Sequence, residues 1–244
     1  MFKKVVRGFR AILGLINPKT WGFFIEHYEN TKFRAAINFS WSQAGEDIGL
    51  AMALNSIENG TYVDVGAHHP TRFSVTQKLY VKGWTGINID ANPELMKRFD
   101  SERPKDINIC ALIGDSKEYT FSIFQEPAIS TTNAEWRDRF LSANNEIISE
   151  FKIRGLPLSE VFSQYLNGSF PDLLCIDAEG SDLEVLLSAK LSPGKGPEWI
   201  LLESFPPLKA ALSTPAVKHA IELGYEVYLQ MPMSTLLRLP QSKR

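Results

Sequence analysis

The stretch TYVDVGAHHP, residues 61–70, decides the fold of this chain. Its first five residues form a short, mostly β-branched run, which is typical of a buried strand. Gly66 closes the run, and a glycine at that place lets a ligand approach the backbone closely. We therefore interpret residues 61–70 as a strand that ends in a ligand-binding loop.

Strands and helices alternate on the C-terminal side of this loop. Such an alternation is typical of βαβ units, in which helices cover both faces of a parallel sheet. We therefore predict an α/β fold with a doubly wound, Rossmann-like sheet, mostly parallel, with an antiparallel C-terminal strand and with helices at the N-terminus. The predicted strands are 61–65, 85–90, 106–112, 171–177, 198–203, 225–231 and 234–239, and the predicted helices are 74–83, 93–100, 181–190 and 214–224.

Two segments lie outside this alternation. We expect residues 1–39 to be an N-terminal helical extension and residues 40–244 to be the main domain, which opens with a helix entered at Ser40 or Ser42. An insertion is predicted at about residues 125–170, after an alternating strand at 117–125. Its place between the third and fourth strands favours a segment that covers the substrate. A surface decoration is an equally good interpretation.

The N-terminal residues are basic and amphipathic. Residues 1–34 hold seven basic and two acidic side chains, and apolar residues recur at helical spacing over residues 1–17. One interpretation is peripheral contact with anionic lipid at the inner face of a membrane. The favoured one is a helix that packs on the domain with its basic side chains in solvent. No apolar run approaches the length of a membrane span or a signal peptide.

Composition narrows the classes of partner and compartment. The chain has 244 residues, with 26 Lys and Arg against 28 Asp and Glu. No basic excess exists, so we expect no nucleic-acid partner. Cys110 and Cys175 lie inside apolar runs and are expected to be reduced, which favours the cytoplasm. The oligomeric state has no signature in the sequence.

A carboxylate at the end of the second predicted strand indicates the ligand. Asp90, in NIDANP, follows Asp64 by 26 residues. A carboxylate there holds both hydroxyls of a ribose in dinucleotide-binding folds. The glycine-rich loops that bind a pyrophosphate or a triphosphate are absent, because Ala67, His68, His69 and Pro70 follow Gly66. S-adenosylmethionine contains adenosine but no phosphate, so it fits this loop.

At this point the sequence resembles the FkbM family of S-adenosylmethionine-dependent methyltransferases. The resemblance covers residues 40–205, and His68-His69-Pro70 stands where many members carry an Asn and a further Gly. It rests on the order and spacing of SQAGED (42–47), YVDVGAHHP (62–70), GWTGINIDANPE (83–94), ALIGD (111–115), LLCIDAEGSDLEVL (173–186) and WILLE (199–203).

The resemblance implies a Rossmann-like methyltransferase domain and a set of site residues. Gly66, with Asp64 and Ala67 beside it, is expected to line the methionine part of the cofactor. Asp90 is expected to bind the ribose, with Ala91 and Asn92 as neighbours. Ala111 and Leu112 are expected to border the adenine, Asp177 to lie next to the methyl group with Glu179 in the same loop, and Gln43 to close over the site.

The expected reaction is O-methylation of a hydroxyl on a sugar, a glycan or a small natural product. A hydroxyl must lose its proton during the transfer, and the candidate bases are Asp177, Glu179, His68 and His69. We favour Asp177 as a group that faces the cofactor or a metal, and His68 or His69 as the base. Asp177 and Glu179 are also suited to a divalent metal, although two carboxylates do not establish one.

Plainer interpretations remain open beside these. The loop at Asp177 and Glu179 is also suited to capping the helix that follows it. Glu46 and Asp47 fit helix-start charges better than catalysis. The alternative functions are a NAD-dependent oxidoreductase, against which the missing glycines argue, and a non-catalytic domain that binds an adenosine cofactor.

Overall fold

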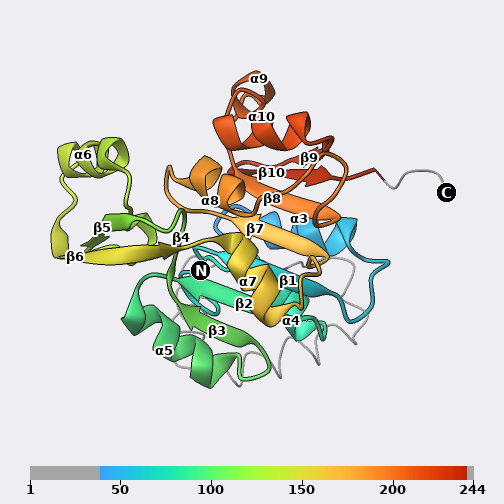
Figure 1. Ribbon diagram of the computed structural model, residues 1–244, viewed down its shortest axis with the longest axis horizontal. Helices are drawn as coiled ribbons and strands as arrows, with labels where there is room; N and C mark the ends of the chain where they lie inside the picture. Colours follow the sequence, from blue (N-terminus) through green and yellow to red (C-terminus); the bar gives the residue numbers. More distant parts are fainter. Residues whose placement is uncertain (1–38, 241–244) are drawn as a thin grey trace, which may run out of the picture. The chain divides into compact units, whose positions relative to one another are not determined.

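The computed structural model describes residues 39–240 (Figure 1). The predicted N-terminal helices, including the basic amphipathic segment 1–17 with its lipid contact, lie outside the described residues. From Ser40 onward the described chain is one compact unit. Within residues 39–240, no helix combines the length and the apolar character that crossing a membrane requires.

The unit is built on a seven-stranded sheet with the strand order β3-β2-β1-β7-β8-β10-β9. All neighbours pair in parallel except that β10 runs antiparallel to β8 and to β9, which confirms the predicted mixed sheet. The strands are β1 (Thr61–Val65), β2 (Thr85–Asp90), β3 (Ile107–Cys110), β7 (Leu173–Ile176), β8 (Trp199–Glu203), β9 (Glu226–Gln230) and β10 (Ser234–Arg238).

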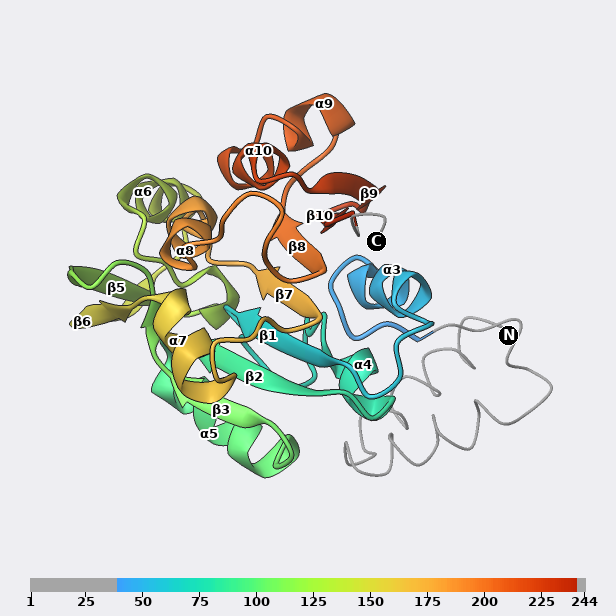
Figure 2. The ribbon, with the colours of Figure 1, turned by 45° about the vertical axis from the view of Figure 1, so that its right-hand side comes forward.

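Helices cover both faces of this sheet (Figure 2). On one face, alternate strand residues such as Val63 and Leu174 pack with α7 (Leu158–Tyr165), α8 (Asp182–Ser188) and α10 (Pro215–Glu222). On the other face, Tyr62 and Leu173 pack with α3 (Glu46–Ala53) and α4 (Gln77–Val81). Two further helices are α5 (Pro93–Glu102) and the short α9 (Leu208–Ala211). The doubly wound architecture follows from this two-sided burial.

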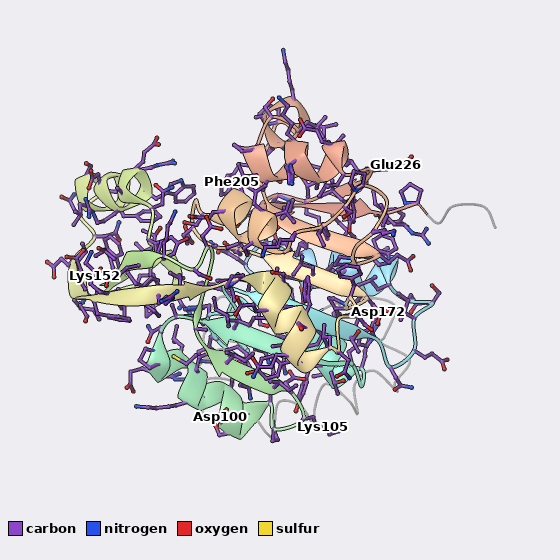
Figure 3. All side chains as sticks on the ribbon, viewed as in Figure 1. Asp100, Lys105, Lys152, Asp172, Phe205 and Glu226 are labelled. Carbon is purple, nitrogen blue, oxygen red and sulfur yellow. The ribbon has the colours of Figure 1, made fainter. Side chains whose placement is uncertain are left out.

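A second, three-stranded sheet forms an arm beside the main sheet. Its order is β4-β6-β5, made by β4 (Leu112–Ile113), β5 (Glu118–Phe124) and β6 (Ile147–Leu156). A 3₁₀ turn, η1 (Pro127–Ile129), and α6 (Ala134–Ser142) connect β5 to β6. The arm extends away from the main sheet in Figure 1, and Lys152 marks its outer part in Figure 3.

Several predicted boundaries are wrong, each for a local reason. The helix after Ser40 begins only at Glu46, because the Ser40 and Ser42 hydroxyls donate to the Asp47 carboxylate at 2.6 and 2.9 Å instead of starting the helix. The strand predicted at 106–112 divides between β3 and β4, which belong to different sheets. The helix predicted at 74–83 is only α4, because the Ser74 hydroxyl accepts from the Gln77 N–H at its start.

Candidate functional site

Three adjoining hollows lie at the carboxyl edge of the main sheet, where such folds bind ligands. The Asp90 hollow has about 590 Å³ of empty space and follows the ends of β1, β2 and β7. The Glu46 hollow has about 580 Å³ and follows the ends of β7, β8 and the start of α3. The smaller Asp64 hollow, of about 360 Å³, shares Gly66 and Asp177 with both of them.

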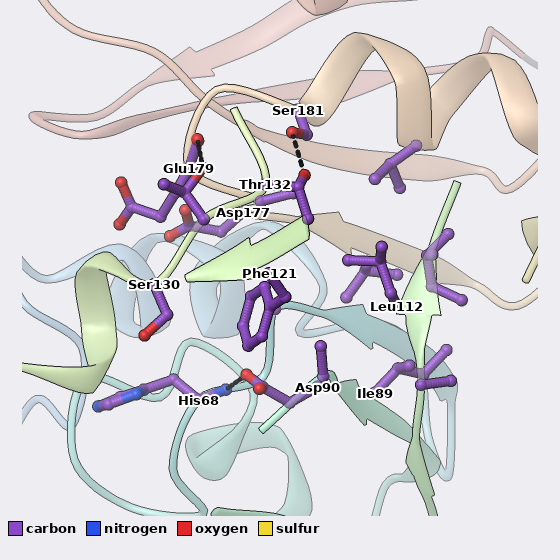
Figure 4. Close-up of a pocket in the computed structure, with 18 of the residues that line it drawn as sticks. His68, Ile89, Asp90, Leu112, Phe121, Ser130, Thr132, Asp177, Glu179 and Ser181 are labelled. Carbon is purple, nitrogen blue, oxygen red and sulfur yellow. Dashed lines mark hydrogen bonds between the residues drawn. The ribbon is translucent and has the colours of Figure 1, made fainter. Parts of the chain in front are cut away.

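Asp90 is held in place by backbone donors (Figure 4). Its Oδ2 accepts from the His68 N–H at 3.0 Å, and its Oδ1 accepts from the Asn92 N–H at 2.8 Å. Burial raises the pKa of this carboxyl to about 6, although both N–H groups act in the opposite direction. Asp90 is therefore a fixed acceptor with lone pairs left for a ligand, as a sugar diol requires.

Apolar side chains surround the rest of the Asp90 hollow. Ile89 of β2, Leu112 of β4 and Phe121 of β5 line it (Figure 4). The arm also contributes Pro127, Ala128, Ser130, Thr131 and Thr132, which follow β5. Part of the segment predicted as an insertion therefore lines the site.

Hydrogen bonds join the arm to the loop between β7 and α8. The Thr131 hydroxyl donates to the Glu179 carbonyl at 2.8 Å, and the Asn133 amide donates to the Gly180 carbonyl at 3.0 Å. A third contact joins the hydroxyls of Thr132 and Ser181 at 3.1 Å (Figure 4). These contacts hold Glu179 in a left-handed conformation with φ of 47°.

Gly66 is needed for a contact between two loops. It has φ of +78°, and a Cβ built on it would lie 1.8 Å from the Asp177 carbonyl oxygen. The loops after β1 and β7 thus approach so closely that no side chain fits between them. This backbone contact places Gly66 and Asp177 together in all three hollows.

A buried arginine donates hydrogen bonds to the loop after β1. Arg103 is fully buried and donates to the Pro70 carbonyl, to the Ser74 hydroxyl at 2.6 Å and to the Thr76 hydroxyl at 2.8 Å. The Thr76 hydroxyl in turn donates to the buried Asp64 carboxylate at 2.7 Å. This network satisfies the buried charge and fixes the loop.

Four carboxyl groups line the Glu46 hollow: Glu46, Asp177, Glu179 and Glu203. Burial raises the pKa of Asp177 although its side chain opens to the cleft, and the nearby Asp182, Asp64 and Glu46 carboxylates raise it further. Burial also raises the pKa of Glu179 and of Glu203, and Asp177 adds to both. These carboxyl groups repel one another when ionised, and a positively charged ligand would favour their ionised forms.

The two adjacent histidines have different surroundings. His68 lines the Asp90 and Glu46 hollows, and burial together with the neighbouring Arg72 lowers its pKa to about 4. The Arg72 Nη1 lies 3.1 Å from the His68 Nε2, while the His68 Nδ1 is buried without a partner. The His69 Nδ1 accepts from the backbone N–H groups of Thr71 and Arg72.

The structure brings most of the predicted site residues together. Gln43 lines the Glu46 hollow, and Asp64 and Ala67 line the Asp64 hollow. His69 and Asn92 line none of the three hollows; the Asn92 side chain instead caps α5 by accepting from the Glu94 N–H at 3.1 Å. The Asp90 hollow is lined by Gly66, His68, Asp90, Ala91, Ala111, Leu112, Asp177 and Glu179.

Some lining residues have no counterpart among the predicted ones. Glu203 ends the apolar strand WILLE, just as Asp177 follows the apolar strand LLCI, so its position was a usable signal. The arm residues from Pro127 to Thr132 carry no such signal, because they reach the site only through the pairing of β5 with β6.

The chain matches the family model of the methyltransferase FkbM domain over residues 64–208. No curated protein matches it in sequence. Among solved structures, it is similar to a TehB-like S-adenosylmethionine-dependent methyltransferase from Corynebacterium glutamicum, at 13% identity and a TM-score of 0.41, over 92% of this chain and 100% of that one.

Two O-methyltransferases are similar at the same level. One is a putative O-methyltransferase from Klebsiella pneumoniae, at 11% identity, a TM-score of 0.44 and 95% coverage of both chains. The other is from Bacillus cereus, in complex with SAH, at 11% identity, a TM-score of 0.41, and 98% and 100% coverage of this chain and that one. The family model spans more than half of the chain, and the strand order and the site suit its fold. The chain therefore belongs to the FkbM family of S-adenosylmethionine-dependent methyltransferases.

Proposed function

We propose that this protein transfers a methyl group from S-adenosylmethionine to a hydroxyl oxygen of a sugar, a glycan or a small natural product. The observation that carries the proposal is the shared lining of the two large hollows. Gly66, His68, Ala128, Asp177 and Glu179 border both the Asp90 hollow and the Glu46 hollow. A cofactor on one side and an acceptor on the other would meet at these residues.

The Asp90 hollow suits the cofactor. Asp90 offers carboxylate lone pairs to the ribose diol, and Ala111 and Leu112 offer an apolar border to the adenine. The loop after β1 has the single close-packed Gly66 rather than the glycines that a pyrophosphate needs. When bound, S-adenosylmethionine supplies an electrophilic methyl group on a sulfonium.

The Glu46 hollow suits a polar acceptor, and Glu179 is our proposed base. Burial raises its pKa to about 9, so it accepts a proton only in the ionised form, which an alkaline pH or a nearby cation favours. The acceptor oxygen forms a bond to the methyl carbon, the carbon–sulfur bond breaks with its electron pair going to sulfur, and the hydroxyl proton passes to a carboxylate. The Glu179 side chain lies at the junction of both hollows, and its loop is fastened by Thr131. The His68 Nε2 faces the Arg72 guanidinium, so we assign His68 a binding role instead.

Two measurements test this proposal. Calorimetry with S-adenosylhomocysteine and with NAD is expected to show binding of the first alone, and Asp90→Asn is expected to weaken it by about 10- to 100-fold, as for lost hydrogen bonds to a charged group. Radiolabelled methyl transfer to hydroxyl-bearing acceptors is expected to fall by about 10²- to 10⁴-fold in Glu179→Gln, while S-adenosylhomocysteine affinity stays within about threefold.

Exposed acidic residues provide matched controls. Asp115→Asn and Glu58→Gln change carboxylates outside the three hollows and are expected to keep both properties. Binding of NAD in place of S-adenosylhomocysteine would contradict the cofactor assignment. Full turnover in Glu179→Gln would contradict the assignment of the base.

A further inference from the structure

Three carboxylates from separate elements converge beside the Glu46 hollow. Asp177 follows β7, Glu203 ends β8, and Asp182 begins α8. One carboxylate oxygen from each lies within 4.8 Å of the other two. Because β7 and β8 are parallel neighbours, their carboxyl ends bring Asp177 and Glu203 to the same edge of the sheet.

A fourth carboxylate is buried in the same hollow with an unused oxygen. Glu46 is only 2% exposed, and its Oε2 accepts from the Ala44 N–H at 3.0 Å. Its Oε1 is buried and has no hydrogen-bond partner. An oxygen in that condition is costly to bury unless a ligand or a bound water satisfies it. The hollow that Glu46 lines also contains Asp177 and Glu203.

In the part of the chain that the structure describes, no cationic side chain neutralises this group by direct contact. Within residues 39–240, none of Glu46, Asp177, Asp182 and Glu203 forms a salt bridge. Arg139 of α6 acts on Glu203 only from a distance. Asp182 has a structural task, since its Oδ1 accepts from the Ala178 N–H at 3.1 Å and the backbone N–H groups of Asp182 and Gly180 also favour its charged form. The remaining oxygens of the group are available to a cation.

We propose that Asp177, Asp182 and Glu203 bind one divalent cation of the Mg²⁺ or Mn²⁺ class, and that Glu46 contacts it through a bound water. Carboxylate oxygens are the ligands that these hard cations prefer, and Mg²⁺ usually keeps several of its waters. The Glu46 Oε1 lies outside the close triplet, so a water on the ion is the partner that would satisfy it.

The place of the ion gives it a role in the reaction, and this role rests on the proposed function. Asp177 and Glu203 border the Glu46 hollow, which we assign to the acceptor. An acceptor hydroxyl that binds the ion would lose its proton more readily, because a divalent cation stabilises the alkoxide. Glu179 would then receive that proton.

Mn²⁺ titration of the full chain, followed by electron paramagnetic resonance, tests the site without any cofactor. We expect one Mn²⁺ per chain, a loss of affinity of at least tenfold in Glu203→Gln, and a smaller loss in Glu46→Gln. Glu58→Gln, on the exposed loop before β1, is the control and is expected to bind Mn²⁺ as the unmodified chain does. Asp182 is left intact because it supports the loop.

The absence of bound Mn²⁺, or equal affinity in Glu203→Gln and the unmodified chain, would overturn the proposal. Circular dichroism of each variant shows whether a lost affinity reflects unfolding, and Asp177→Asn is the second variant if Glu203→Gln unfolds. Calorimetry with S-adenosylhomocysteine on the same preparations separates the two proposals. Binding of S-adenosylhomocysteine without Mn²⁺ would contradict only the cation site, and binding of Mn²⁺ without S-adenosylhomocysteine would contradict only the proposed function.

Discussion

The two large hollows differ in how their polar groups are satisfied. In the Asp90 hollow, Asp90 accepts from two backbone N–H groups, and the walls around it are largely apolar. In the Glu46 hollow, four carboxyl groups gather, and the Oε1 of Glu46 has no partner. The first hollow suits a nucleoside, whereas the second suits the divalent cation that we propose.

The two hollows at this edge of the sheet are therefore suited to different ligands. The Asp90 hollow is preorganised, since the Arg103 network and the fastened arm fix its walls before any ligand arrives. The Glu46 hollow instead holds carboxyl groups that no described cationic side chain contacts, so its affinity for a ligand depends on the charge of that ligand. Gly66 and Asp177, which belong to both, are where the two hollows are coupled.

The largest expected effect comes from breaking the element that both hollows share. In Gly66→Ala, the new methyl group would meet the Asp177 carbonyl oxygen and force the two loops apart. We expect a loss of about 2 kcal/mol or more in the free energy of unfolding, together with loss of S-adenosylhomocysteine and Mn²⁺ binding. Chemical denaturation and calorimetry measure these effects.

Gly168→Ala is the matched control for that variant. Gly168 also has a positive φ, of +77°, but nothing lies within 4 Å of the position where its Cβ would be. It is therefore expected to cost only the backbone strain, about 1 kcal/mol, and to leave both ligands bound. Equal effects of the two substitutions would show that the contact between the loops does not matter.

The pH dependence of S-adenosylhomocysteine affinity tests the role of Asp90. Its pKa of about 6 means that Asp90 is ionised above that pH and gains a proton below it. A neutral carboxyl accepts the ribose hydroxyls less well, so S-adenosylhomocysteine affinity should be constant above about pH 7 and fall below pH 6, approaching about tenfold per pH unit.

The groups around Asp90 allow this inflection to be assigned. The Asp64 carboxylate acts on it from β1, and the His68 and Asn92 N–H groups contact it directly. The pKa of the His68 ring is about 4, too low to produce a change near pH 6. Asp177 lines the same hollow and has a pKa of about 7, so it titrates in the same range. Calorimetry over pH 5–8 should therefore lose the inflection near pH 6 in Asp90→Asn and keep it in Asp177→Asn, and the reverse result would assign it to Asp177.

The main sheet was predictable because its strands carry their own signal. The runs at β1, β2, β7 and β8 are apolar and end in Gly66, Asp90, Asp177 and Glu203, which places the site at their carboxyl ends. In the arm, β5 was predicted as the alternating strand 117–125, but β6 was not, since half of its residues are exposed and it is held by its register with β5. A polar strand that depends on a distant partner looks like a loop in the sequence.

The candidate site divides in the same way. Asp90 was found because it ends an apolar strand, and Asp177 through the family resemblance. Nothing local distinguishes His68, which faces the hollows, from His69, which accepts from its own turn. The unused oxygen of Glu46 is equally invisible in the sequence, where Glu46 fits a helix-start charge. Orientation depends on contacts between loops that are far apart in the chain.

The smallest expected effect concerns the surface contact between the loop after β1 and the arm. Arg72 donates to both Glu126 oxygens, at 2.9 and 2.6 Å, and both side chains are 42% exposed, so the pair is worth less than about 1 kcal/mol. It still acts on His68, whose pKa Arg72 lowers and Glu126 raises. Arg72→Met should therefore raise the pKa of His68, and Glu126→Gln should lower it.

Nuclear magnetic resonance of the ring protons measures both shifts. Because the two changes have opposite signs, the double variant should return the His68 pKa toward its original value while the stability changes by less than about 1 kcal/mol. If the His68 pKa shifted in the same direction in both single variants, the ion pair would act on His68 by moving the loop. The Asp90 hollow would then be less preorganised than the Arg103 network implies.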